Sequence, residues 1–316
     1  MTHGNVPLKS RGDLWFDDGN IVLLIDSNPE TEDGFIAFKV HRGVLARHSE
    51  VFRSLFEMPQ PANEAEMLDN CQVVRMYDLP IELSNLIKAL YDGAQFTNGS
   101  VQDFFFLAGI LRLSTKYFIA HLRTQAIRHL TKTWAYTLQG HDEMVALALS
   151  SPLINGTTYP YVHPLHVFNL ARETNADHPK LTVEHPSRPS SHLAIQDIKD
   201  YTLMYQHRID LILDFIRRTC AERTAEEDCQ GVPNNCSRVF SRLAYNISQS
   251  FTSRTGPYHN MMQAVQWIDD DVAICSVCKR AFRQDVTRHR EEIWAELPSL
   301  IGLPGWKELE AMDLPS

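Results

Sequence analysis

The stretch that decides the fold covers residues 38–56 and reads FKVHRGVLARHSEVFRSLF. It opens as the end of a strand, because residues 35–40 form a short apolar run rich in residues that favour strands. It then becomes a helix, since the apolar pairs at 44–45, 51–52 and 55–56 recur at offsets of seven and four and share one face. A helix with so apolar a face has to pack against another element.

The composition limits the class of protein around this stretch. The 316 residues are enough for two domains, and 44% hydrophobic with 22% charged residues is typical of a soluble globular chain. The net charge of −9 and the lack of a basic run argue against direct contact with nucleic acid. No apolar segment is long enough for a membrane span, and the first 20 residues hold no secretory signal. We therefore expect an intracellular protein, cytoplasmic or nuclear, without a membrane partner.

Secondary-structure patterns divide the chain into two parts. Strands are predicted at residues 14–16, 21–25, 35–40 and 71–77, with a loose arm over 1–12 and an exposed loop over 58–70. After about residue 92 the patterns are helical only, and the first of these helices carries Phe104, Phe105 and Phe106, which we interpret as core. The sequence thus predicts an α+β domain over 13–135 and an all-α region over 136–316, with a proline-containing linker at about 176–191.

The opening stretch resembles a BTB/POZ domain in its ordered motif residues. They are His41, Arg42, Leu45, Ala46, Ser49, Val51 and Phe52. Segments at 73–80, 90–93 and 111–126 resemble the later motifs of this family, so the likeness covers roughly residues 13–132. The whole chain is also similar to a large set of fungal BTB proteins whose helical C-terminal region carries two cysteine pairs and ends in Leu-Pro and Leu-Pro-Gly-Trp, here at 297–298 and 303–306.

This resemblance implies a protein-interaction module and not an enzyme. Family members form homo- or hetero-dimers, and some branches recruit a cullin ubiquitin ligase or transcriptional corepressors. The hydrophobic-x-Glu motif associated with cullin binding has two imperfect matches, at 55–57 inside the helix and at 62–64 in the loop. The charged pocket of transcription-factor members would involve Arg42, but Asn20 stands at the acidic position, with Asp18 two residues earlier. An interaction protein, a cullin adaptor and a transcriptional co-regulator without direct DNA contact remain alternatives.

Four cysteines carry the clearest chemical signal. Cys275 and Cys278 form a C-x₂-C knuckle, which can direct two thiolates at one metal, and Cys229 with Cys236 offers a second pair. A structural zinc ion at these four residues, unliganded thiols, and a redox pair are the alternatives. Cys220, His259 and His289 are reserve ligands.

Catalytic patterns are missing from the sequence. It contains no P-loop, no G-x-G-x-x-G, no G-x-S-x-G and no H-E-x-x-H motif. We therefore predict no catalytic residues and no catalytic cofactor. His41 is interpreted as a structural histidine at the junction of strand and helix, hydrogen-bonded to the backbone.

Overall fold

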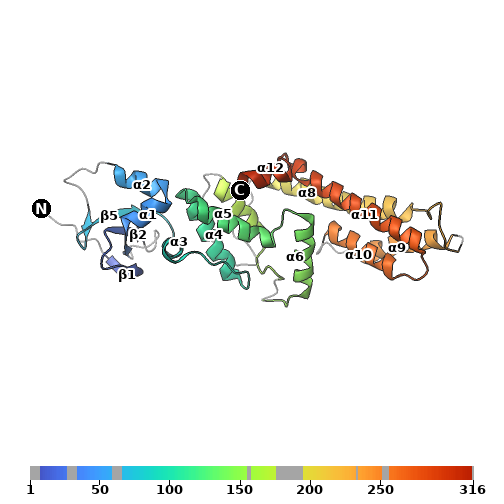
Figure 1. The fold of residues 1–316 in the computed structure, drawn as a ribbon, viewed down its shortest axis with the longest axis horizontal. Helices are drawn as coiled ribbons and strands as arrows, with labels where there is room; N and C mark the ends of the chain where they lie inside the picture. Colours follow the sequence, from blue (N-terminus) through green and yellow to red (C-terminus); the bar gives the residue numbers. More distant parts are fainter. Residues whose placement is uncertain are drawn as a thin grey trace. The chain divides into compact units, whose positions relative to one another are not determined.

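The computed structural model describes residues 8–26, 34–58, 66–154, 158–175, 195–232, 234–250 and 256–314. The chain divides into two compact units, one made of residues 1–131 and 153–191 and the other of residues 132–152 and 192–316 (Figure 1). The linker predicted at 176–191 lies outside the described residues.

The first unit contains a five-stranded sheet with the order β1-β3-β2-β5-β4. The strands are β1 (Leu8–Trp15), β2 (Ile21–Asp26), β3 (Phe35–Val40), β4 (Met67–Leu68) and β5 (Cys71–Met76). The central strand β2 pairs antiparallel with β3 and parallel with β5, and its residues 21–25 are buried on both faces. This double burial explains its continuous apolar run.

Two predictions about this sheet were wrong. The loose arm expected over 1–12 contains the start of β1, which pairs in parallel with β3, and the loop expected over 58–70 contains β4. The backbone can join a sheet edge without an apolar signal, because the ladder bonds are made by the main chain. Gly12 also allows a close approach, since a Cβ there would lie 2.3 Å from Cε1 of Phe38.

The helices of the first unit pack on this sheet and on each other. They are α1 (Arg42–His48), α2 (Glu50–Glu57), α3 (Pro80–Asp92), α4 (Val101–Lys116), the greater part of α5 (Ala120–Thr133) and α7 (Pro164–Asn175). The opening stretch forms two helices instead of one, because Ser49 is extended and its hydroxyl accepts a hydrogen bond from the backbone N–H of Phe52 as the cap of α2. The same hydroxyl donates to the carbonyl of Tyr117 at 2.6 Å and so ties the break to the end of α4.

The second unit is entirely helical over its described residues. It contains α6 (Leu138–Ser150), α8 (Ile195–Asp214), the π-helical turn Phe215–Ala221, α9 (Asn235–Ser250), α10 (Pro257–Asp270), α11 (Ser276–Glu296), the 3₁₀ turn Leu297–Ile301 and α12 (Trp306–Asp313). Its core is built around the fully buried rings of Phe215, Phe240 and Phe282. The predicted fold class, a small sheet with helices followed by an all-α region, is confirmed.

Candidate functional site

The junction between β3 and α1 is fixed by His41. Its Nδ1 lies 2.8 Å from Tyr91 Oη, its Nε2 lies 3.2 Å from a carboxylate oxygen of Asp18, and its backbone N–H also donates to Tyr91 Oη. The prediction of a structural histidine with backbone partners was wrong about the partners, which are side chains. The hydrogen bond from His41 lowers the pKa of Asp18.

The loop between β5 and α3 lies against the turn between α4 and α5. The buried carboxylate of Asp78 accepts hydrogen bonds from Nζ of Lys116, at 2.5 Å, and from the hydroxyl of Tyr117. On either side of this anchor, Tyr77 is 77% exposed and Phe118 is 69% exposed, and Ile81 at the start of α3 is 66% exposed. We call Tyr77, Leu79, Ile81 and Phe118 the apolar edge.

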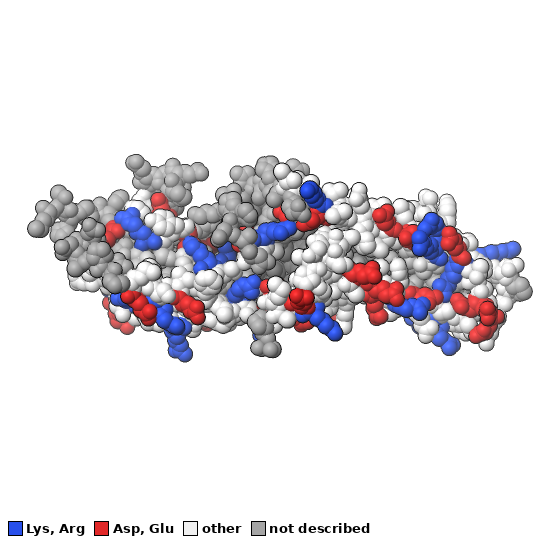
Figure 2. Space-filling view, turned by 90° about the horizontal axis from the view of Figure 1, so that it is seen from above, with Lys and Arg blue, Asp and Glu red and all other residues white. Residues whose placement is uncertain are grey.

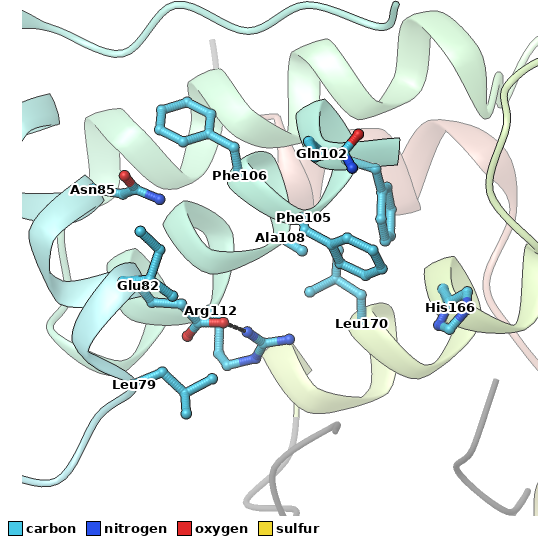
Figure 3. A pocket seen from close by; sticks show the side chains of 12 residues that line it. Leu79, Glu82, Asn85, Gln102, Phe105, Phe106, Ala108, Arg112, His166 and Leu170 are labelled. Atoms are coloured by element: carbon cyan, nitrogen blue, oxygen red, sulfur yellow. Dashed lines mark hydrogen bonds and ion pairs between the residues drawn. The ribbon is translucent and has the colours of Figure 1, made fainter. Parts of the chain in front are cut away.

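An open pocket of about 510 Å³ lies between α3, α4 and α7 (Figure 3). Its walls are mostly apolar and include Phe104, Phe105 and Leu170. The aromatic cluster interpreted as core is therefore only half-buried over the first turns of α4, and it lines this pocket.

Arg112 lines the pocket and pairs with two carboxylates, of which only Glu82 also lines it. The guanidinium of Arg112 pairs with Glu82 of α3, drawn as a dashed line in Figure 3, and with Glu173 of α7 at 2.9 Å. Burial opposes the charged form of Arg112, but the two carboxylates outweigh it and raise its pKa. The contact with Glu173 spans 61 residues of sequence, so no local pattern could reveal it.

The four cysteines lie together in the second unit. The sulfur atoms of Cys229, Cys236, Cys275 and Cys278 are all within 4.8 Å of one another. Cys229 Sγ is 3.6 Å from both Cys236 Sγ and Cys275 Sγ. Within the described residues the cluster includes none of the three reserve ligands. This arrangement is compatible with a structural metal ion.

Each sulfur of the cluster accepts a hydrogen bond from at least one backbone N–H. The donors are Gly231 for Cys229 at 3.4 Å, and Cys275 for Cys236, Cys278 for Cys275 and Glu226 for Cys278, each at 3.5 Å. The N–H of Cys278 is the main reason that the pKa of Cys275 falls to about 6. Burial raises the pKa of Cys236 and of Cys278.

A family model for the BTB/POZ domain matches residues 33–132. These residues form a BTB/POZ domain. No curated protein matches the chain. The BTB/POZ domain is a protein–protein interaction module.

The charged pocket of transcription-factor BTB domains is rebuilt here. The guanidinium of Arg42 donates to the carbonyl of Phe56 at 2.9 Å and lies over the Phe56 ring. Asn20, at the acidic position, accepts from the backbone N–H of Arg42 at 2.8 Å and so secures the start of α1. The second match to the cullin motif, residues 62–64, lies outside the described residues.

Surface charge is mixed on the face seen in Figure 2. Acidic and basic side chains alternate over the described residues of this face, and neither sign forms a continuous track. None of the described helices combines the length and the apolar character that a membrane span requires.

Proposed function

We propose that the protein is a non-enzymatic interaction protein whose BTB/POZ domain forms homodimers or binds a protein partner. The observation that carries this proposal is the BTB/POZ match over residues 33–132. The helical region would bind a second partner and thereby link two proteins. One structural zinc ion at Cys229, Cys236, Cys275 and Cys278 belongs to the proposal, whereas a catalytic cofactor does not. The proposed boundary between the BTB/POZ part and the helical part lies at residue 135. The proposed location is the cytoplasm or the nucleus.

The apolar edge supports binding by the BTB/POZ domain. Large apolar side chains that stay exposed together on one edge commonly mark protein contacts. Tyr77 and Phe118 are chain neighbours of Asp78 and Tyr117, so the hydrogen bonds of the Asp78 anchor hold the backbone that carries them. A rigid edge lowers the entropy that is lost on binding.

Light scattering of the full chain tests dimerisation. A homodimer should have twice the 36.2 kDa mass of one chain, and dilution should return it to the monomer mass. Affinity purification with the full chain and with residues 1–135 should then assign partners to the two parts. A chain that stays monomeric at every concentration and retains no specific protein would overturn the proposal.

Variants of the apolar edge locate the contact. Tyr77→Glu and Phe118→Glu should each weaken binding at least about tenfold, because they place a charge in a dehydrated contact. Val272→Glu is the matched control, since Val272 is an exposed apolar residue of the second unit. Equal losses from all three variants would point to misfolding, and circular dichroism would detect this.

A cullin adaptor and a transcriptional co-regulator are the two narrower roles. Binding to the N-terminal region of a cullin, beside an established adaptor as positive control, would select the first role. Corepressor capture without DNA binding would select the second. The Arg42 site gives the co-regulator role less support, because Asn20 is uncharged and contacts the backbone N–H of Arg42, while the guanidinium binds the carbonyl of Phe56.

A further inference from the structure

The cysteine cluster joins two segments of the chain, 229–236 and 275–278, and Cys236 and Cys275 are 39 residues apart in the sequence. Cys229 lies in the turn before α9, Cys236 in the first turn of α9, and Cys275 and Cys278 cap and begin α11. Cys236 and Cys278 are fully buried and belong to the core that also holds Phe240 and Phe282. The cluster therefore lies at the point where the loop before α9 meets the two helices.

The sulfur spacing fits a central ion and not a disulfide. Four sulfurs that each lie about 2.3 Å from a tetrahedral zinc ion are about 3.8 Å from one another. The separations of 3.6 Å from Cys229 Sγ to Cys236 Sγ and to Cys275 Sγ are close to this value. A disulfide would bring two sulfurs to about 2.05 Å.

The backbone around the cluster directs N–H donors at all four sulfurs. Each of the four sulfurs accepts its own N–H, and a hydrogen bond to the charged form stabilises that form. The N-termini of α9 and α11 both point partial positive charge at the cluster. Four thiolates within 4.8 Å repel one another strongly unless a cation lies between them.

We infer that Cys229, Cys236, Cys275 and Cys278 bind one zinc ion as a closed four-thiolate site that fixes the loop before α9 to the start of α11. This inference rests on the structural role of the cysteines in the proposed function, but not on partner binding by the BTB/POZ domain. Soft thiolates select zinc over magnesium or calcium, which prefer oxygen ligands. Four protein ligands leave no open coordination position, so the ion is structural and not catalytic.

Gly231 supports the same arrangement by its size. A Cβ on Gly231 would lie 3.0 Å from Cys236 Sγ and 3.5 Å from Cys229 Sγ. The loop therefore passes directly over the sulfurs. This close passage allows the Gly231 N–H to donate to Cys229 and reduces the access of solvent to an ion.

Elemental analysis of the full chain tests the inference. Protein purified without a polyhistidine tag should contain about one zinc ion per chain, the stoichiometry of a closed four-ligand site. Modification of four thiols should release that zinc completely. The double variant Cys275→Ser/Cys278→Ser should lose at least five-fold in bound zinc. Cys71→Ser and Cys220→Ala should keep the full amount, because neither residue belongs to the cluster.

Cobalt exchange keeps the test valid if the double variant does not fold. Wild-type protein in which Co²⁺ replaces the native ion should show the thiolate-to-cobalt charge transfer and the ligand-field bands of a tetrahedral four-sulfur site. A metal-free wild-type chain that is folded, a chain that contains iron instead of zinc, or undiminished zinc in the double variant would each overturn the inference. Light scattering on the same samples separates the two proposals, because a metal-free dimer would refute zinc while leaving the interaction function intact.

Discussion

At Asp78 a single carboxylate holds the loop before α3 to the end of α4. It is buried, and it accepts from both Lys116 and Tyr117. Asp78→Ala leaves the buried hydroxyl of Tyr117 without this acceptor, so we expect a loss of about 2 kcal/mol in the free energy of unfolding. Urea denaturation measures this change.

The matched controls for Asp78→Ala separate its two partners. Asp78→Asn keeps an acceptor for Tyr117 and should cost less than the alanine variant. Lys116→Ala should cost no more than Asp78→Ala, because the ammonium is nearly half exposed and the buried Asp78 carboxylate keeps the hydrogen bond from Tyr117. A larger loss of unfolding free energy from Lys116→Ala than from Asp78→Ala would contradict the view that Asp78 is the centre of this anchor.

Gly231 gives a second prediction about a single residue. Gly231→Ala places a methyl group 3.0 Å from Cys236 Sγ, so it should reduce bound zinc and lower the unfolding midpoint of the helical unit. Gly43→Ala is the control, because a Cβ at Gly43 meets nothing within 4 Å and alanine favours the helix. Elemental analysis and thermal unfolding should therefore separate the two glycines, and equal behaviour would contradict the close passage over the sulfurs.

Among the elements, those with local signals were predictable from the sequence. The apolar face of α3, the strand β2 and the motif residues around His41 follow from periodicity and turn residues, which act over a few positions. The start of β1 at Leu8 was missed, because its sequence LKSRGDLW lacks strand alternation and its pairing with β3 depends on distant backbone.

The candidate sites also divide into residues with a local sequence signal and residues that only the tertiary structure brings together. The C-x₂-C spacing pointed to Cys275 and Cys278 because both lie within one turn. Whether Cys220 takes the place of Cys229 or Cys236 depends on how the loop before α9 folds, and a polar loop has no periodicity that could decide this. The pocket was missed for a similar reason, since α7 reaches α4 only through tertiary contacts such as Arg112 with Glu173.

The helix α7 is held on α4 by that ion pair. Arg112→Ala would leave Glu82 and Glu173 as largely buried carboxylates without their cation, which should cost about 3 kcal/mol. Hydrogen exchange should show faster exchange in α7 than in α3. Arg112→Lys should keep part of the protection, and the substitution of the exposed Arg128 by alanine serves as a surface control. Unchanged protection of α7 in Arg112→Ala would contradict this anchor.

The helices α6 and α11 are joined by Asp142 and Arg290, whose atoms lie 2.6 Å apart. Burial would raise the pKa of Asp142, but hydrogen bonds from His141 and Arg290 outweigh it and lower that pKa. A carboxyl with a lowered folded-state pKa stabilises the fold above its unfolded pKa, about 3.9, and this contribution is lost as pH falls through the folded value.

Asp142→Asn should therefore lower the free energy of unfolding at pH 7 by about 2 kcal/mol, less than for a fully buried pair because Asp142 is a third exposed. The difference between wild type and variant should shrink as the pH falls below about 4. Urea denaturation across this range measures it. If the difference in unfolding free energy between wild type and Asp142→Asn stays constant down to the lowest pH, the stabilisation does not come from the charged Asp142 carboxylate.

On the scale of the whole molecule, the two units have separate cores, and the cysteine cluster belongs to the second. Zinc binding adds to the folding free energy only of the elements that its ligands join. Removal of zinc from the full chain should thus destabilise α9 and α11 by about 4 kcal/mol, if free zinc is about 1,000 times its Kd. The buried strand β2 should keep its unfolding midpoint.

Hydrogen exchange in increasing urea, with and without a zinc chelator, resolves both units in one experiment. The chelator should move the midpoint of α9 and α11 to lower urea and leave β2 unchanged. The double variant Cys275→Ser/Cys278→Ser should reproduce the shift without chelator, and adding chelator to it should have no further effect. A joint shift of β2 with α9 would instead show that the two units unfold as one cooperative body, so that zinc stabilises the BTB/POZ domain as well.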